Sequence, residues 1–135
     1  GWMDRLIERA KYLLTLEEDF VLAGDYNVCP KDEDCYDIVR FANDALVQPE
    51  LRDRFYTLLN LGLTDAFRAF TPSGRNYTYW DYQAGAWQRD NGLRIDHLLL
   101  SPEAGDRLTD VGIDRSPRGL EKPSDHTPIW CTLRD

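Results

Sequence analysis

The fold class follows from the stretch DFVLAGDYNV (residues 19–28) and from what surrounds it. Its first six residues form a short apolar run that ends in Gly24, a pattern typical of a buried β-strand. Asp25 and Asn27 follow directly. Because side chains of an extended chain alternate between its two sides, both should project on the same side at the end of the strand. An Asp and an Asn after a glycine also suit a turn, so this motif alone leaves a turn-forming role open.

Helical patterns lie on both sides of this strand. Apolar residues recur at helical spacing from Trp2 to Leu14, which predicts one amphipathic helix. Pro49 suits the first turn of a second helix, and Gly62 lies just past its end. Later segments rich in aromatic or β-branched residues predict strands at NYTYWDY (76–82), LRIDHLLLS (93–101), DVGID (110–114) and PIWCTL (128–133). The chain is therefore predicted to be a mixed α/β protein with a layered sheet.

Composition limits the class of protein. The chain has 135 residues, of which 42% are hydrophobic, enough for one domain with a core. No run of 18 apolar residues and no signal peptide is visible, which predicts a cytoplasmic protein without a membrane segment. The net charge of −8 argues against a protein that mainly coats nucleic acid, but an enzyme that holds divalent cations also concentrates carboxylates. The acidic segment KDEDCYD (31–37) is interpreted as a solvated loop, and the three cysteines as reduced.

Two further polar positions stand out. Asp96 interrupts the apolar strand LRIDHLLLS, where an unpaired charge is costly, so we expect it to have a partner. His97 should point to the opposite face, as a surface or packing residue. Near the C-terminus, KPSDHTPIW (122–130) places Asp125 and His126 between two prolines. They could be turn residues, or a metal-bound carboxylate and an imidazole that faces a phosphate.

Three carboxylates, one amide and one imidazole on strand ends or adjoining loops suit phosphoryl transfer. Such chemistry needs a cation, a base for water and donors to the phosphate oxygens. Other chemistries lack their motifs, because the chain has no GxSxG elbow, no phosphate-binding glycine loop and no HExxH.

Five motifs occur in order along the chain: GDYNV (24–28), LTDAFR (63–68), NYTYWDY (76–82), GLRIDHLLLS (92–101) and KPSDHTPIW (122–130). Together they closely resemble the exonuclease III branch of the endonuclease/exonuclease/phosphatase family, the DNA-repair nucleases that cut at abasic sites. GDxN with SDH fits the whole superfamily, including its phosphatases, whereas NYTYWDY followed by GLRID resembles the DNA-repair branch.

The resemblance implies a fold with one part missing. Residues 1–135 resemble the C-terminal half of a four-layer α/β/β/α sandwich, and the N-terminal half, with its metal-binding Glu, is absent. We therefore expect an isolated fragment with little or no activity, which self-associates through an exposed apolar sheet face.

The resemblance also implies a role for each motif residue. Asp25 corresponds to the carboxylate that orients or deprotonates the attacking water or protonates the leaving oxygen, and Asn27 to the amide that positions the phosphate. His126 resembles the imidazole that donates to a phosphate oxygen. Asp96 resembles the carboxylate that bonds this imidazole from behind, which supplies the partner that its place in a strand requires. Asp125 resembles a ligand at or near a Mg²⁺ or Mn²⁺ site.

For the substrate, the resemblance implies double-stranded DNA with abasic sites or 3′ ends. The family's pocket for the flipped-out sugar is lined by residues that match Tyr79, Leu93 and Ile95, which implies a small apolar slot that a base would overfill. Trp80, Trp87 and Arg89 could contact DNA, with aromatic core packing as the alternative.

Two functional alternatives remain beside the metal-dependent DNA hydrolase. The chain could be a non-catalytic module for folding or DNA contact, or a superfamily phosphatase that acts on a lipid or inositol phosphate.

Overall fold

The computed structural model describes all 135 residues and has an α/β architecture. Helices and strands follow one another in the order α1 (Trp2–Thr15), β1 (Val21–Asp25), α2 (Pro49–Asn60), β2 (Thr64–Asp65), α3 (Ala66–Phe70), β3 (Tyr79–Trp80), β4 (Gly92–Leu93), β5 (Asp96–Leu100), α4 (Pro102–Asp106), β6 (Leu108–Ile113) and β7 (Ile129–Leu133). The two long helices confirm the predicted ones, including the start of α2 at Pro49. No helix has the length and hydropathy needed to cross a membrane.

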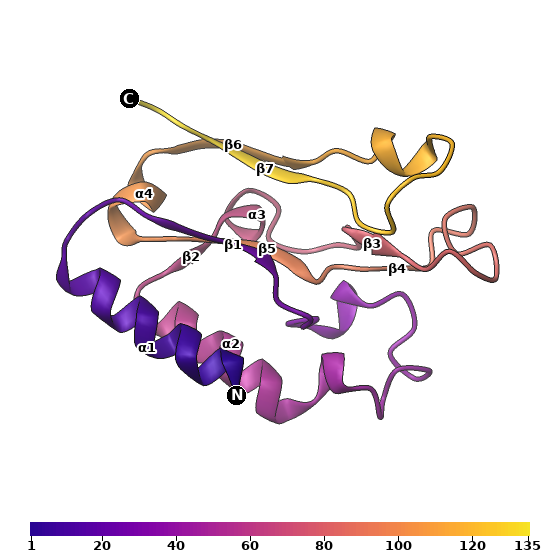
Figure 1. Cartoon of the computed structure of the whole chain (residues 1–135), viewed down its shortest axis with the longest axis horizontal. Coiled ribbons are helices and arrows are strands. Elements are labelled where there is room, and N and C mark those ends of the chain that lie inside the picture. The colour runs from indigo at the N-terminus through magenta and orange to yellow at the C-terminus, as the bar shows by residue number, and fades with distance from the viewer.

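The strands form three small antiparallel sheets. The central sheet has the order β1-β5-β2, and the pairs β3-β4 and β6-β7 form the other two. In Figure 1 the β6-β7 ribbon and the short helix α3 lie above the central strands, and the long helices α1 and α2 lie below them. In Figure 1 the pair β3-β4 continues the central layer to the right, below the loop that joins β6 to β7.

The predicted strand at 93–101 is interrupted. It divides into β4, which pairs with β3, and β5, which pairs with β1 and β2. Between them, the Arg94 N–H donates to the Asp34 carbonyl at 2.8 Å and the Ile95 N–H to Thr78 Oγ1 at 3.2 Å. These bonds to loop residues replace the ladder bonds of a continuous strand. NYTYWDY is likewise shorter than predicted, with only Tyr79–Trp80 in a strand.

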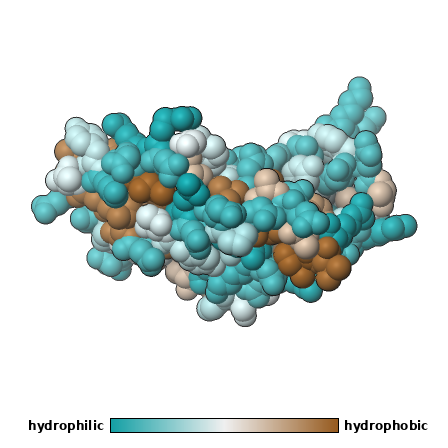
Figure 2. Space-filling view, turned by 90° about the horizontal axis from the view of Figure 1, so that it is seen from below, coloured by the Kyte–Doolittle hydropathy of each residue, from teal (hydrophilic) through white to brown (hydrophobic).

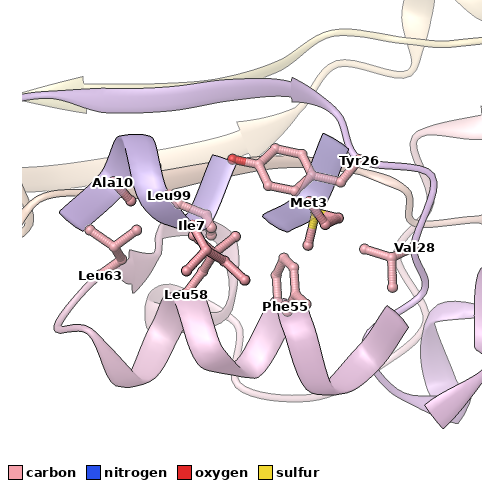
Figure 3. Packing of buried hydrophobic residues seen from close by; sticks show 9 residues of the cluster. All are labelled: Met3, Ile7, Ala10, Tyr26, Val28, Phe55, Leu58, Leu63 and Leu99. Carbon is pink, nitrogen blue, oxygen red and sulfur yellow. The ribbon is translucent and has the colours of Figure 1, made fainter. Parts of the chain in front are cut away.

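The main core lies between the two long helices and the central sheet. Met3, Ile7 and Ala10 of α1 pack in one buried cluster with Phe55 and Leu58 of α2, as Figure 3 shows. The apolar spacing of each helix therefore becomes a buried stripe, and the outer face stays polar. Seen from the helical side, the surface is mainly hydrophilic with smaller hydrophobic patches (Figure 2).

Strand β1 corrects the prediction of a buried strand. Four of its five residues are exposed, and Val21 keeps 38% of its surface accessible. The reason is its position at the edge of the sheet, where β5 covers one side of β1 and nothing in the chain pairs with the other. An apolar run predicts a strand correctly here, but it does not say whether both faces will be covered.

Candidate active site

The candidate site forms around a hydrogen bond between two motifs that are far apart in the sequence. His126 Nδ1 lies 2.8 Å from Asp96 Oδ2. Asp96 is the first residue of β5, and the loop that carries His126 is held against β3 by two backbone bonds, from the Trp80 N–H to the Asp125 carbonyl and from the Thr127 N–H to the Thr78 carbonyl. The expected partner of Asp96 is thus His126.

The environment of the pair favours a charged imidazole. Burial by itself would lower the pKa of His126, but the hydrogen bond that it donates to Asp96 and the charges of Asp96, Asp25 and Asp125 outweigh it, so this pKa is raised above its usual value. For Asp96, burial is the largest effect and raises its pKa, although His126 and Thr78 both donate to it. The raised pKa of His126 matters more for chemistry than that of Asp96, because Nε2 of the imidazole ring remains free for a ligand.

Asp25 and Asn27 reach the same place from β1. Asp25 pairs with Asp96 in the antiparallel register, and its Oδ2 lies 3.7 Å from His126 Nε2. The chain then turns, because Asn27 has a left-handed backbone with φ of 49° and its N–H donates to Asp25 Oδ1 at 2.8 Å. Asn tolerates this conformation better than most residues. The turn-forming and the site-forming interpretations of this motif therefore both apply.

The site also has a set of oxygen ligands. Ligand atoms of Asp25, Asp96 and His126 lie within 4.8 Å of one another. Asp125 adds a carboxylate oxygen 3.9 Å from His126 Nε2. Asp96 already accepts a hydrogen bond from His126, so Asp25 and Asp125 are the carboxylates free to bind a cation. Carboxylate oxygens suit Mg²⁺ or Mn²⁺.

A cavity of about 450 Å³ opens beside His126. It is lined by the three residues expected to form a pocket, Tyr79, Leu93 and Ile95, and by Asn27. Only half of its lining residues are hydrophobic, so it is larger and more polar than the small apolar slot that the sequence suggested. The additional residues come mainly from 36–46 and 81–91, where Tyr36, Arg40, Phe41, Asp44 and Arg89 contribute. The first of these segments carries no motif that could have indicated it.

Trp80 does not line this cavity. Its side chain is completely buried, its Nε1–H donates to Asp90 Oδ1 at 2.9 Å, and its ring packs edge-on against Trp87 at 4.9 Å. This arrangement favours the alternative of aromatic packing over direct contact with a substrate. Arg89, in contrast, is exposed to solvent and lines the cavity.

The acidic segment 31–37 is only partly the solvated loop that was predicted. Asp34 is fully buried, and its Oδ1 accepts hydrogen bonds from Arg68 and Arg94, each at 2.7 Å. The guanidinium groups of buried Arg94 and partly buried Arg68 explain how a carboxylate can be stable there. Charge clustering in the sequence could not distinguish this residue from its exposed neighbour Asp32.

Comparison with known proteins gives consistent matches. The model of the Endonuclease/Exonuclease/phosphatase family matches residues 1–126. Exodeoxyribonuclease III of Haemophilus influenzae is 34% identical over 122 residues, which is 84% of this chain and 45% of that protein. A 3′ phosphatase from Neisseria, solved with a product DNA hairpin, aligns with a TM-score of 0.95 and 40% identity over 98% of this chain and 52% of its own. An AP endonuclease from Archaeoglobus fulgidus aligns with a TM-score of 0.91 and 32% identity over the same shares, 98% and 52%. The chain spans about half the length of the curated relatives it matches.

Proposed function

The chain belongs to the endonuclease/exonuclease/phosphatase family, in its exonuclease III-like branch, and on this premise we propose that it supplies catalytic groups to a metal-dependent hydrolase of DNA phosphodiester bonds. The proposed substrates are double-stranded DNA at abasic sites and at 3′ ends. The observation that carries the proposal is the 2.8 Å bond between His126 and Asp96 beside an open cavity.

His126 is the proposed donor to the phosphate. Asp96 accepts a hydrogen bond from the Nδ1–H of His126, which turns Nε2 toward Asp25 and the cavity. Because its pKa is raised, the imidazole carries a second proton over a wider pH range, and it donates that proton in a hydrogen bond to a non-bridging phosphate oxygen. This donation stabilises the negative charge that develops on the phosphate oxygens as water attacks.

Asp25 and Asn27 complete the set on the β1 side. Asp25 orients the attacking water and accepts its proton while the new bond from oxygen to phosphorus forms. The bond from phosphorus to the departing sugar oxygen then breaks, and that oxygen takes up a proton from solvent water. The Asn27 side chain lines the cavity with His126 and donates to a phosphate oxygen.

The residues present fit a hard divalent cation. Asp125 would hold Mg²⁺ or Mn²⁺ through a carboxylate that lies 3.9 Å from His126 Nε2, on the same side of the ring as Asp25. When bound, the ion would supply charge neutralisation at the phosphate and lower the pKa of water. The family's general dependence on divalent metals supports this assignment.

A cleavage assay tests the proposal. Labelled duplexes carry an abasic-site analogue, a 3′ phosphate or no modification, and an inositol phosphate serves as the competing substrate. The chain is assayed alone and together with the segment of the H. influenzae relative that it does not cover, with Mg²⁺ or with EDTA. We expect Mg²⁺-dependent cleavage of the abasic and 3′-phosphate duplexes by the mixture, at least about a thousandfold faster than by the chain alone, because a positioned cation contributes several kcal/mol.

Two variants separate the possible outcomes. His126→Ala should abolish cleavage, whereas Glu121→Ala, an exposed position in the same loop, should leave it unchanged. Hydrolysis of the inositol phosphate without cleavage of DNA would favour the phosphatase alternative. Binding of the abasic duplex without cleavage in any mixture would favour the non-catalytic module.

Self-association is a second part of the proposal. Trp2, Leu6 and Val21 line a shallow hollow of about 270 Å³ between α1 and the free edge of β1. Exposed apolar side chains beside an unpaired strand edge are a typical surface for association with a second chain. Sedimentation should show concentration-dependent dimers, and Val21→Lys should shift them to monomers. A monomer at all concentrations would contradict this part alone.

A further inference from the structure

The strand β5 presents two neighbouring side chains to opposite faces of the sheet. Asp96 points to the candidate site, where it bonds His126. His97 points into the core and is completely buried, with its ring against those of Tyr26, at 5.5 Å, and Phe55, at 4.9 Å. A fully buried imidazole needs hydrogen-bond partners for both ring nitrogens, so these partners determine which nitrogen carries the proton.

Both partners of His97 are in place. Its Nε2 lies 2.9 Å from the Val28 carbonyl, and its Nδ1 lies 3.3 Å from Arg94 Nη1. A guanidinium can only donate and a carbonyl can only accept. Nδ1 is therefore the unprotonated nitrogen, and the Nε2–H donates to Val28. Burial is the main cause that lowers the pKa of His97 to about 4, so the ring is neutral and keeps this one tautomer at neutral pH.

Arg94 is itself held rigidly. Its Nε donates to Asp34 at 2.7 Å and its Nη2 to Asp65 at 3.2 Å, and its side chain is 1% exposed. The charge of Arg94 thus stays in place beside His97, and protonation of Nδ1 would bring two positive groups together. The network therefore fixes both ring nitrogens: Nδ1 accepts from Arg94, and the Nε2–H donates to the Val28 carbonyl.

The Val28 carbonyl ends the segment that carries two site residues. Within this segment the Tyr26 N–H donates to the Ile95 carbonyl at 2.9 Å, and Asn27 has the left-handed backbone noted above. Just beyond it, the Cys29 N–H donates to the Leu46 carbonyl at 2.9 Å. Figure 3 shows Tyr26 above Phe55 and Val28 to the right of Phe55, at one end of the core. A left-handed residue is held in place by its surroundings, and His97 supplies a side-chain bond to the residue that follows it.

We propose that His97 is a positioning residue of the candidate site: its hydrogen bond to the Val28 carbonyl, made from an imidazole whose tautomer Arg94 selects, holds Asn27 and Asp25 toward His126. Two successive residues of β5 then serve the same site from opposite faces, Asp96 by orienting His126 and His97 by orienting the end of β1. The proposal rests on the proposed function for its catalytic meaning, but its structural content can be tested without measuring hydrolysis.

Two amide variants separate the two hydrogen bonds of the ring. His97→Gln places an amide N–H near the position of Nε2 and keeps the donor to Val28, whereas His97→Asn is one carbon shorter and keeps only an acceptor near Nδ1. Both keep a polar side chain of moderate size at the same buried position. The readout is amide hydrogen exchange by NMR at Tyr26 and Cys29, with the amides of β5 and α2 as internal references.

We expect His97→Asn to raise exchange at Tyr26 and Cys29 by roughly tenfold relative to the reference amides, the size expected for one lost buried hydrogen bond. His97→Gln should remain within about threefold of the wild-type protein at the same amides, since most of one hydrogen bond is kept. Three results would overturn the proposal. In His97→Asn, the exchange rate could rise equally at all amides, or it could rise at none. Alternatively, both variants could show the same local rise at Tyr26 and Cys29. If His97→Asn does not fold, a selective rise at Tyr26 and Cys29 in His97→Gln alone still overturns it. Because no cleavage is measured, a failure of the proposed function leaves this result unaffected.

Discussion

Replacing Asp34 with Asn tests the buried charge network that supports the candidate site. Asp34 Oδ1 accepts hydrogen bonds from Arg68 and Arg94 at 2.7 Å each, and its Oδ2 accepts one from the Lys31 N–H at 3.0 Å. Asn has nearly the same size and keeps one acceptor oxygen, so the variant removes the charge with little change in packing. Arg94 then keeps Asp65 as its remaining carboxylate, at 3.2 Å.

The expected loss follows from the burial of both partners. Breaking a fully buried ion pair on one side costs about 3–5 kcal/mol, because the other charge stays buried without compensation. Asp65 and the remaining acceptor of Asn offset part of this, so we expect about 3 kcal/mol. The entropy of unfolding is about 0.28 kcal/mol/K for a chain of 135 residues, which converts this loss into a decrease of about 11 °C in Tm.

Asp32→Asn is the matched control. Asp32 lies in the same acidic segment and also pairs with an arginine, Arg52, at 2.9 Å, but its side chain is 67% exposed. Exposed pairs contribute about 0–1 kcal/mol, so this variant should lower Tm by less than about 4 °C. Thermal unfolding followed by circular dichroism compares the two variants. Equal losses from Asp34→Asn and Asp32→Asn would refute the argument that burial makes the difference.

The stability lost in Asp34→Asn should also depend on pH. Burial acts to raise the pKa of Asp34, but the charges and hydrogen bonds of Arg94 and Arg68 outweigh it, so the pKa in the folded state is lowered. A lowered pKa contributes stability that is fully present above the unfolded value of about 3.9 and is lost as the pH falls through the folded value. The difference in stability between wild-type protein and Asp34→Asn should therefore be constant from about pH 5 to 7 and shrink in stronger acid. A difference that grows in acid would contradict the assignment.

Three further predictions concern the site itself. Asp96→Asn should lower the pKa of His126, because it removes the negative charge that raises this pKa and leaves only a neutral acceptor oxygen. NMR titration of the metal-free chain should therefore show the ring losing its proton at lower pH than in the wild type, and an unchanged midpoint would contradict the pairing. Added Mn²⁺ should broaden the NMR signals of Asp25 and His126 before those of α1 and α2, and uniform broadening would argue against a localised site. Gly92→Ala should destabilise the protein by about 1–3 kcal/mol in urea unfolding, because a Cβ there would meet the buried Tyr77 side chain at 2.5 Å; a stabilised variant would show that β4 can move away.

Local rules in the sequence determined the long elements and the direction of key side chains. The helical spacing of apolar residues, Pro49 and Gly62 predicted α1 and α2 because each signal acts within a few residues along the chain. The alternation of side chains along an extended chain correctly predicted that Asp96 and His97 point to opposite faces. Asp96 points to the site, and His97 points into the core.

Only the tertiary structure decided how these pieces meet. The contact between Asp96 and His126 joins residues 30 positions apart, and sequence reasoning reached it through a family resemblance and not through spacing. The break between β4 and β5 depends on bonds from loop residues such as Thr78, which no pattern within the strand could reveal. Burial of Asp34 likewise requires arginines from two other segments. Hydrogen bonding and burial depend on what lies opposite in space, whereas sequence patterns report only what lies nearby along the chain.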